Sequence, residues 1–167
     1  MTKRILGFAI LLVAGLTTVQ AQVTTPKKED VPKYLAMLKN QSNSKDRALG
    51  AEMLGKRGQI QVKDVKNAIE PLLAAMKNDS VADVRRAAAT ALGTIGTQPK
   101  TVVPALMDAL KDKALPVNMA AINALAAFGP EAREAVPALR EFAKTKKDKQ
   151  IMRAVNLAVK QINGKVK

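Results

Sequence analysis

The chain has 167 residues and contains no cysteine, histidine or tryptophan. Thiolate and imidazole groups are the usual ligands of zinc, thiolate is a common nucleophile, and imidazole is the usual general base near neutral pH. Only carboxylates, lysines and hydroxyls remain for chemistry, and the sequence pairs no nucleophile with an adjacent base. It therefore argues against an enzyme and predicts no metal or cofactor site.

Aromatic side chains are also scarce, at 2% of the residues. After residue 21 the only ones are Tyr34, Phe128 and Phe142, two of them at positions typical of a core. Proteins that bind single-stranded nucleic acid stack bases on aromatic side chains, so nucleic acid is an unlikely partner. No stretch alternates apolar and polar residues in the manner of a β-strand, so we expect no strands.

Long hydrophobic runs are limited to one, Ile5 to Leu16, which follows Lys3 and Arg4. Its 12 residues are fewer than the about 20 that span a bilayer. The run ends in the tripeptide V-Q-A, so we expect residues 1–21 to be a signal peptide that is cleaved after Ala21. The protein would then be exported to the periplasm or secreted, with no transmembrane segment. An uncleaved anchor and a buried helix are the alternatives, and the lack of cysteine excludes a lipoprotein anchor.

Residues 22–30 are polar and are expected to form a flexible leader. From residue 31 onward, related phrases recur at an offset of 33: EPLLAAMKND at 70–79, VPALMDALKD at 103–112 and VPALREFAKT at 136–145. A fainter copy, VPKYLAMLKN, lies at 31–40. Recurrence at such a period is typical of a solenoid. We divide the chain into four units, at about 31–58, 62–96, 99–129 and 130–164, followed by a basic tail at 165–167.

Within each unit, helical periodicity on both sides of a polar turn predicts a helix–turn–helix pair. Asp79 or Ser80 is placed to cap the second helix of unit two. Gly96 and Gly129 are expected to end second helices in the left-handed conformation. Pro137 lies inside a helical pattern, which predicts either a kink or a helix that starts late.

The layout resembles that of HEAT repeats: a proline in the first helix, an aspartate in the turn, Val-Arg opening the second helix, and a small-residue stretch ending in Leu-Gly-x-Ile-Gly. Unit two carries all of these, from Pro71 to Ile95-Gly96, whereas unit three has Asn118 in place of the arginine. The resemblance implies an all-α solenoid. It also implies that Arg85 bonds a turn aspartate of its own or a neighbouring unit, so that Asp79 and Asp112 are structural rather than catalytic.

HEAT-like arrays mostly resemble protein-interaction scaffolds whose second helices line the concave face. The resemblance therefore implies a protein partner that binds the outward positions of these helices. We call these eight residues the concave strip: Lys56, Arg86, Thr90, Thr94, Met119, Asn123, Arg153 and Lys160.

The formal net charge of +14 is concentrated at the ends of the chain. Residues 142–167 hold eight basic residues against Asp148 alone. Such charge suits the solubility of a terminal repeat, and it also suits attraction to a polyanion or an anionic membrane surface. We call the densest group the basic patch: Lys144, Lys146, Lys147 and Lys149.

Three functions follow from these patterns. The first is an exported, non-catalytic binding module, and the second is a polyanion binder that acts through its basic ends. The third is an enzyme, because some HEAT-like proteins resemble bilin lyases or DNA-alkylation repair glycosylases. An exported chain without histidine, cysteine and tryptophan fits the third poorly.

Overall fold

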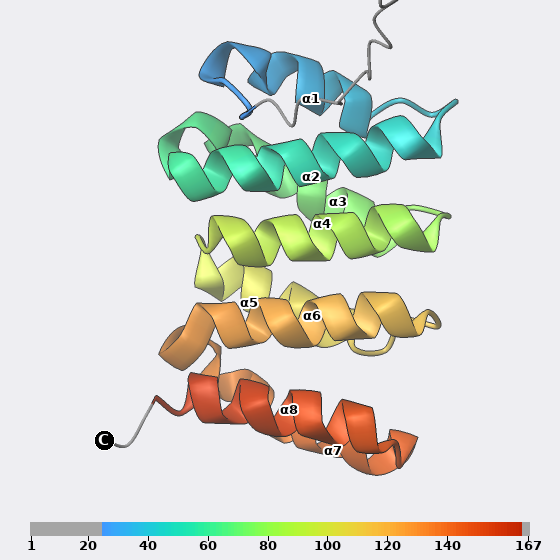
Figure 1. The fold of residues 1–167 in the computed structure, drawn as a ribbon, viewed down its shortest axis with the longest axis vertical. Helices are drawn as coiled ribbons and strands as arrows, with labels where there is room; N and C mark the ends of the chain where they lie inside the picture. The colour runs from blue at the N-terminus through green and yellow to red at the C-terminus, as the bar shows by residue number, and fades with distance from the viewer. Residues whose placement is uncertain (1–24, 165–167) are drawn as a thin grey trace, which may run out of the picture.

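The structure is a computed structural model that describes residues 25–164 (Figure 1). These residues form helices and turns and contain no strand. The α-helices are α1 (Val31–Leu38), α2 (Ser44–Ile60), α3 (Ile69–Asn78), α4 (Ala82–Ile95), α5 (Pro99–Ala109), α6 (Leu115–Phe128), α7 (Val136–Lys146) and α8 (Lys149–Ile162). Three 3-10 segments precede first helices: η1 (Lys28–Asp30), η2 (Val62–Ala68) and η3 (Gly129–Ala135).

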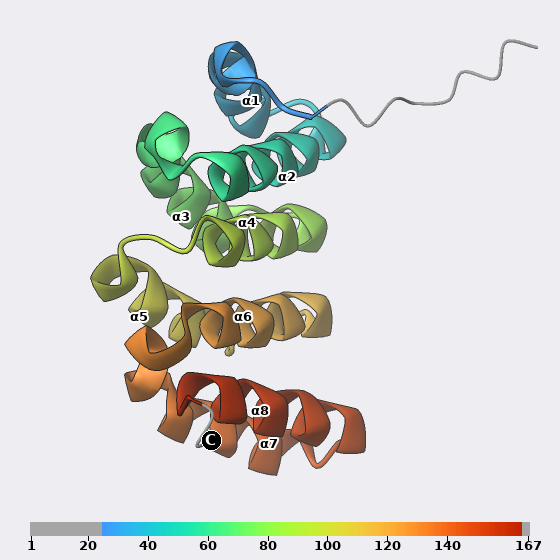
Figure 2. The same ribbon diagram turned by 60° about the vertical axis from the view of Figure 1, so that its left-hand side comes forward.

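The helices form two layers, which confirms the predicted all-α solenoid. The second helices of the units, α2, α4, α6 and α8, stack side by side in one layer (Figure 1). Of the first helices, α3 and α5 lie behind this layer in Figure 1, α7 lies partly behind α8, and α1 lies above α2 at the N-terminal end of the stack. Neighbouring second helices pack together closely, whereas neighbouring first helices touch much less. The second-helix side is therefore the shorter, concave side, and the first helices bulge at α3 and α5 (Figure 2).

Two glycines allow this close packing of second helices. A Cβ built on Gly55 of α2 would lie 2.9 Å from Ala91 Cα on α4. A Cβ built on Gly93 of α4 would lie 2.6 Å from Ala124 Cα on α6. Because the obstructing atoms are backbone, any larger side chain at either glycine would push the two units apart.

The core consists of apolar side chains that repeat from unit to unit. Val84, Val117 and Ile151 are buried near the starts of their second helices. Leu92 of α4 is also buried, at 1% exposure. Each unit offers its neighbour the same kind of surface, so burial extends along the array, as in other repeat proteins.

The helix ends agree with the sequence in part. Gly96 ends α4 in the left-handed conformation, with φ 59° and ψ 38°. Gly129 after α6 also has a positive φ of 55°, but its ψ of −133° lies outside the left-handed helical region. Pro137 lies in the first turn of α7, which begins at Val136 after η3, so the late start is the correct alternative.

The expected capping of α4 by Asp79 or Ser80 is wrong. Val81 occupies the N-cap position and provides no side-chain bond. The Asp79 carboxylate instead accepts a hydrogen bond from the Val81 N–H, at 2.9 Å, within the turn. The aspartate stabilises the turn before the helix rather than the helix terminus, because its other contacts hold it toward unit one.

The described part of the predicted leader contacts the array. Pro26 is buried, and its carbonyl accepts a hydrogen bond from Arg57 Nη1 at the end of α2. Arg57 also forms an ion pair with Asp64 of η2, which Lys28 approaches to 3.9 Å. Residues 25–30 therefore cover the N-terminal edge of the solenoid. The predicted signal peptide, residues 1–21, lies outside the described residues, as does the basic tail.

None of the helices formed by residues 25–164 combines the length and apolarity needed to cross a membrane.

Candidate protein-binding face

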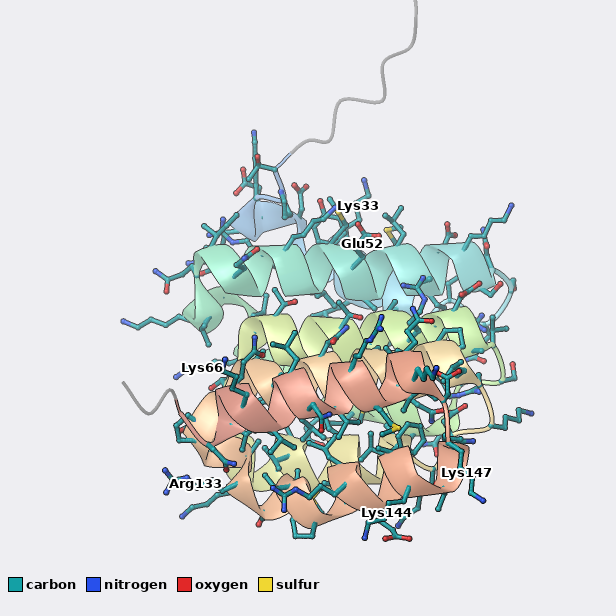
Figure 3. All side chains as sticks on the ribbon, turned by 60° about the horizontal axis from the view of Figure 1, so that its bottom comes forward. Lys33, Glu52, Lys66, Arg133, Lys144 and Lys147 are labelled. Atoms are coloured by element: carbon teal, nitrogen blue, oxygen red, sulfur yellow. The ribbon has the colours of Figure 1, made fainter. Side chains whose placement is uncertain are left out.

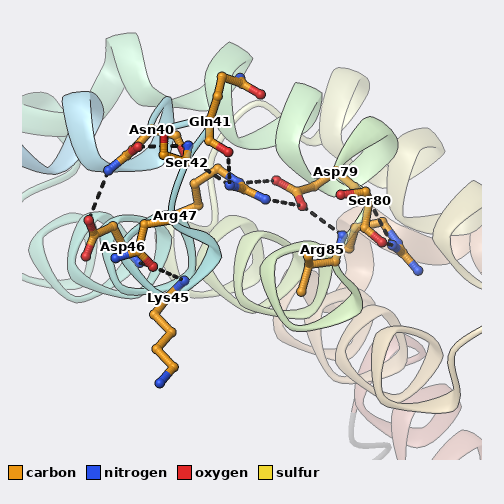
Figure 4. Close-up of polar contacts among 11 residues, drawn as sticks. Asn40, Gln41, Ser42, Lys45, Asp46, Arg47, Asp79, Ser80 and Arg85 are labelled. Carbon is orange, nitrogen blue, oxygen red and sulfur yellow. Dashed lines mark hydrogen bonds and ion pairs between the residues drawn. The ribbon is translucent and has the colours of Figure 1, made fainter.

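Two buried arginines join consecutive units and fix the geometry of the concave face. Arg47 of α2 donates from Nε to Asp79 Oδ2 at 2.6 Å and from Nη2 to Asp79 Oδ1 at 3.1 Å (Figure 4). Its Nη1 donates to the backbone carbonyls of Asn40 and Gln41 in its own unit. One side chain thus holds its own turn and the turn of the next unit.

Arg85 of α4 repeats this arrangement one unit later. Its Nε and Nη2 donate to Asp112 of unit three at 2.6 and 2.9 Å. Its Nη1 donates to the carbonyls of Asp79 and Ser80 at 2.8 and 3.2 Å. We call Arg47–Asp79 and Arg85–Asp112 the inter-unit ion pairs. The second confirms the prediction that Arg85 bonds a turn aspartate.

The ion pairs keep both carboxylates charged. Burial works to raise the pKa of Asp79, but hydrogen bonds from Arg47 and from the Val81 N–H outweigh it and lower the pKa below the ordinary 3.8. Hydrogen bonds from Arg85 lower the pKa of Asp112 against a smaller effect of burial. Neither carboxylate is free for acid–base chemistry, in keeping with their expected structural role.

A groove runs along the concave face between α2 and α4. Its floor is made of small side chains, including Gly55, Ala87 and Ala91. The residues along its two edges are polar or aliphatic: Ser44, Lys45, Ala48, Leu49, Glu52, Lys56 and Gln59 on α2, and Asp83, Arg86, Thr90 and Thr94 on α4. The groove exists because the two helices approach through alanine and glycine while longer side chains rise on either side.

Four residues of the concave strip line this groove: Lys56, Arg86, Thr90 and Thr94. Lys56 is half-buried and pairs with Glu52 at 2.6 Å. Arg86 is exposed and approaches Asp83 to 3.5 Å. The hydroxyls of Thr90 and Thr94 donate to carbonyls one turn earlier in α4, so each hydroxyl oxygen can still accept a hydrogen bond.

The other four strip residues lie outside the groove. Met119 and Asn123 belong to α6, where Met119 is half-buried against the core and Asn123 is exposed. Arg153 and Lys160 are exposed on α8. Lys160 corresponds in the repeat to Gly93, which faces the next unit, so Lys160 belongs to the open end of the array rather than to the concave face.

Leu49 and Leu157, two of the exposed leucines on the second helices, were missed from the sequence. Leu49 of α2 is 45% exposed and lines the groove. Leu157 of α8 is 58% exposed and corresponds in the repeat to Thr90 and Asn123. Thr90 and Asn123 are 33 residues apart, and the step from unit three to unit four is 34 residues long. Counting this longer step from Asn123 would have identified Leu157 as a position of the concave strip.

The basic patch lies at the turn between α7 and α8, at the far end of the array. Lys144 and Lys147 extend from it (Figure 3). Lys144 approaches Glu141 to 3.8 Å, and Lys146 Nζ lies 5.6 Å from the centre of the Phe142 ring. The patch is therefore a separate surface from the groove between α2 and α4.

Residues 25–164 contain no group of three or more Asp, Glu, His or Cys side chains placed to hold a metal ion.

The family model of HEAT repeats matches this chain over residues 31–101 and 69–160. The two matches cover most of the chain, and the protein belongs to the HEAT repeat family. It is therefore a helical repeat scaffold, with the inter-unit ion pairs and concave second helices described above.

Comparison with solved structures agrees on the fold. A designed armadillo repeat protein in complex with the peptide (KR)4 superimposes with a TM-score of 0.65 at 15% identity, covering 83% of this chain and 70% of that one. The CpcE–CpcF complex of phycocyanin lyase from Nostoc sp. PCC7120 gives a TM-score of 0.53 at 19% identity, covering 79% of this chain and 99% of that one. At these identities the likeness concerns the fold alone. No curated protein sequence matches the chain.

Proposed function

We propose that this protein is an exported, non-catalytic scaffold that binds a protein partner on the concave face formed by α2, α4, α6 and α8. The observation that carries the proposal is the groove between α2 and α4, whose edges hold Lys56, Arg86, Thr90 and Thr94. Its small-residue floor and its mixed polar and aliphatic edges suit a polypeptide segment, which presents both backbone polar groups and side chains.

The solved relatives support this choice of partner class without deciding it. The armadillo repeat protein was solved with a peptide, and CpcE was solved with CpcF. Both are assemblies of helical repeats with polypeptides, and the same class of partner suits the present groove.

A second candidate is binding of a polyanion or an anionic membrane surface through the basic patch. The observation that favours it is the gathering of Lys144, Lys146, Lys147 and Lys149 at one turn, with Glu141 and Asp148 as the acidic residues beside them. Attraction of this kind is screened by salt, whereas a packed groove contact is less sensitive to it.

A pull-down from the exported fraction at low and high salt separates the two candidates. Arg86→Glu and Asn123→Arg on the concave face should abolish retention of the partner, while changing all four patch lysines to glutamine should leave it intact. Arg133→Glu in η3 is the matched control, because it makes the same charge change as Arg86→Glu on the first-helix layer. Retention that survives the concave changes but is lost with the lysines would replace the scaffold proposal by the polyanion proposal.

Export is proposed from residues 1–21 of the sequence. Intact-mass measurement of the exported protein should give a chain that begins at Gln22, and a full-length chain in the membrane fraction would contradict it.

A further inference from the structure

The arginine that joins each unit to the next is not kept along the whole array. Arg47, Arg85, Asn118 and Met152 occupy equivalent positions in the four second helices. Met152 lies at the open end and is 47% exposed, as expected where no unit follows. Asn118 lies at the junction of units three and four, where a third inter-unit ion pair would form.

Asn118 performs only half of the arginine's role. It is 1% exposed, and its Nδ2 donates to the carbonyls of Ala109, Leu110 and Asp112 at 3.0 to 3.1 Å. These acceptors belong to the turn of its own unit, like those of Nη1 in Arg47 and Arg85. The side chain is too short to add the bond to the next unit, so the contact across the junction is lost.

The acceptor of that missing bond has also changed, and its charge is reversed. Asp79 and Asp112 each lie five residues before the buried aliphatic residue of their second helix, Val84 and Val117. Five residues before Ile151, the equivalent position holds Lys146, whose ammonium lies over the Phe142 ring. An arginine at 118 would meet a cation there, so the two departures from the pattern are consistent with each other.

Apolar packing alone holds this junction. Of the ion pairs and side-chain hydrogen bonds formed among residues 25–164, none joins unit three to unit four. The two units touch where α6 packs against α8 and where η3 packs against α5 and α6. Helix α6 packs less extensively against α8 than against α4.

We infer that unit four is a separable end of the solenoid, which undocks from the first three units far more often than unit one does at the other end. Units one to three form the fixed part of the array. Undocking changes where Arg153 and Leu157 of α8 lie relative to Arg86 and Thr90 of α4. If the protein-binding proposal holds, on which this consequence rests, the concave face adapts its length and curvature to the partner at this junction.

Amide hydrogen exchange of the mature chain, followed by mass spectrometry, tests the inference. It compares α2 with α8, the second helices of the two terminal units. A charged bidentate pair suffices to change an opening equilibrium by about tenfold or more, so amides of α8 should exchange at least about tenfold faster than those of α2. Equal protection of the two helices would overturn the inference, since both belong to terminal units and, among residues 25–164, only the junction of unit one has ion pairs to its neighbour.

Transferring the ion pair provides the causal test. Asn118→Arg together with Lys146→Asp should slow exchange in α8 by about tenfold, while Lys146→Asp alone should not. The converse exchange, Arg47→Asn with Asp79→Lys, should make α2 exchange about tenfold faster than in the wild type. If the first pair fails to fold, the converse pair decides, and an unchanged α2 then overturns the inference. Neither measurement uses a partner, so a failure of the protein-binding proposal would leave them unaffected.

Discussion

Replacing Arg85 by methionine should destabilise the protein severely, although the residue lies in the alanine-rich helix α4. The side chains of Arg85 and Asp112 are 6% and 14% exposed. The guanidinium makes four hydrogen bonds, two to Asp112 and two to the carbonyls of Asp79 and Ser80. Methionine fills a similar volume but leaves the Asp112 carboxylate partly buried without its cation. Removal of one member of a buried pair costs about 3–5 kcal/mol, and we expect a loss in this range.

The next residue along the chain supplies a matched control. Arg86 lies in the same helix α4, but its pair with Asp83 is 3.5 Å long and the two side chains are 46% and 75% exposed. Exposed pairs contribute little, so Arg86→Met should change the free energy of unfolding by less than about 0.5 kcal/mol. Urea unfolding at pH 7, followed by circular dichroism, measures both variants against the wild type.

A double change separates the lost attraction from the uncompensated charge. Asp112→Asn retains an oxygen that can accept from the Ala114 N–H, as Asp112 Oδ1 does at 2.8 Å. Combined with Arg85→Met it should cost less than the sum of the two single changes, because no buried charge then remains. The buried pair does not have this role if Arg85→Met costs no more than Arg86→Met, or if the costs of the single changes simply add.

Two further outcomes follow from the same structure. Gly93→Ala should lower the free energy of unfolding by about 1–2 kcal/mol. Overpacking against the Ala124 backbone outweighs the gain of up to about 1 kcal/mol in helix propensity. The control in the same unfolding assay is Thr94→Ala, at the next residue, which is exposed. The lowered pKa values of Asp79 and Asp112 give stability that is fully present above 3.8 and is lost as the pH falls through the lower folded-state values. The urea midpoint should therefore fall as the pH is lowered below about 4, and less steeply in Asp112→Asn than in the wild type.

The repeated sequence segments were sufficient to predict the solenoid, because the residues that recur in them are those that pack one unit against the next. Val84, Val117 and Ile151 repeat since each must fill the same space between helices. Arg85 could be assigned to a turn aspartate through the family resemblance. Its choice of Asp112 in the next unit, rather than Asp79 in its own, depended on the distance between units, which sequence spacing does not give.

The junction of units three and four shows where sequence alignment becomes ambiguous. Asn118 was recognisable as a departure from the family pattern, but its counterpart Lys146 was not. Aligned through Pro137, the position of Asp112 corresponds to Thr145; aligned through Ile151, it corresponds to Lys146. The extra residue lies in the turn, where Lys147 takes the left-handed conformation with φ 50°, and only the structure locates it.

Capping and curvature could not be predicted for related reasons. Asp79 has the residue type of an N-cap, yet Arg47 from another unit holds its carboxylate away from α4. Gly55 and Gly93 look like ordinary members of small-residue stretches. Their importance comes from the backbone of the neighbouring helix, 2.6 to 2.9 Å from the Cβ they lack, which no pattern within one unit contains.

The contrast between repeating and varying positions indicates how such an array can select a partner. Positions that face the core are constrained by stacking, because every junction must bury a similar surface. The outward positions on the second helices are free of that constraint, and they differ from unit to unit: Thr90 becomes Asn123 and then the exposed Leu157. A partner that lay along the whole face would therefore meet hydroxyls at α4, an amide at α6 and an aliphatic side chain at α8. Such a sequence of contacts has a direction, so it fixes the polarity of a bound segment as well as its composition.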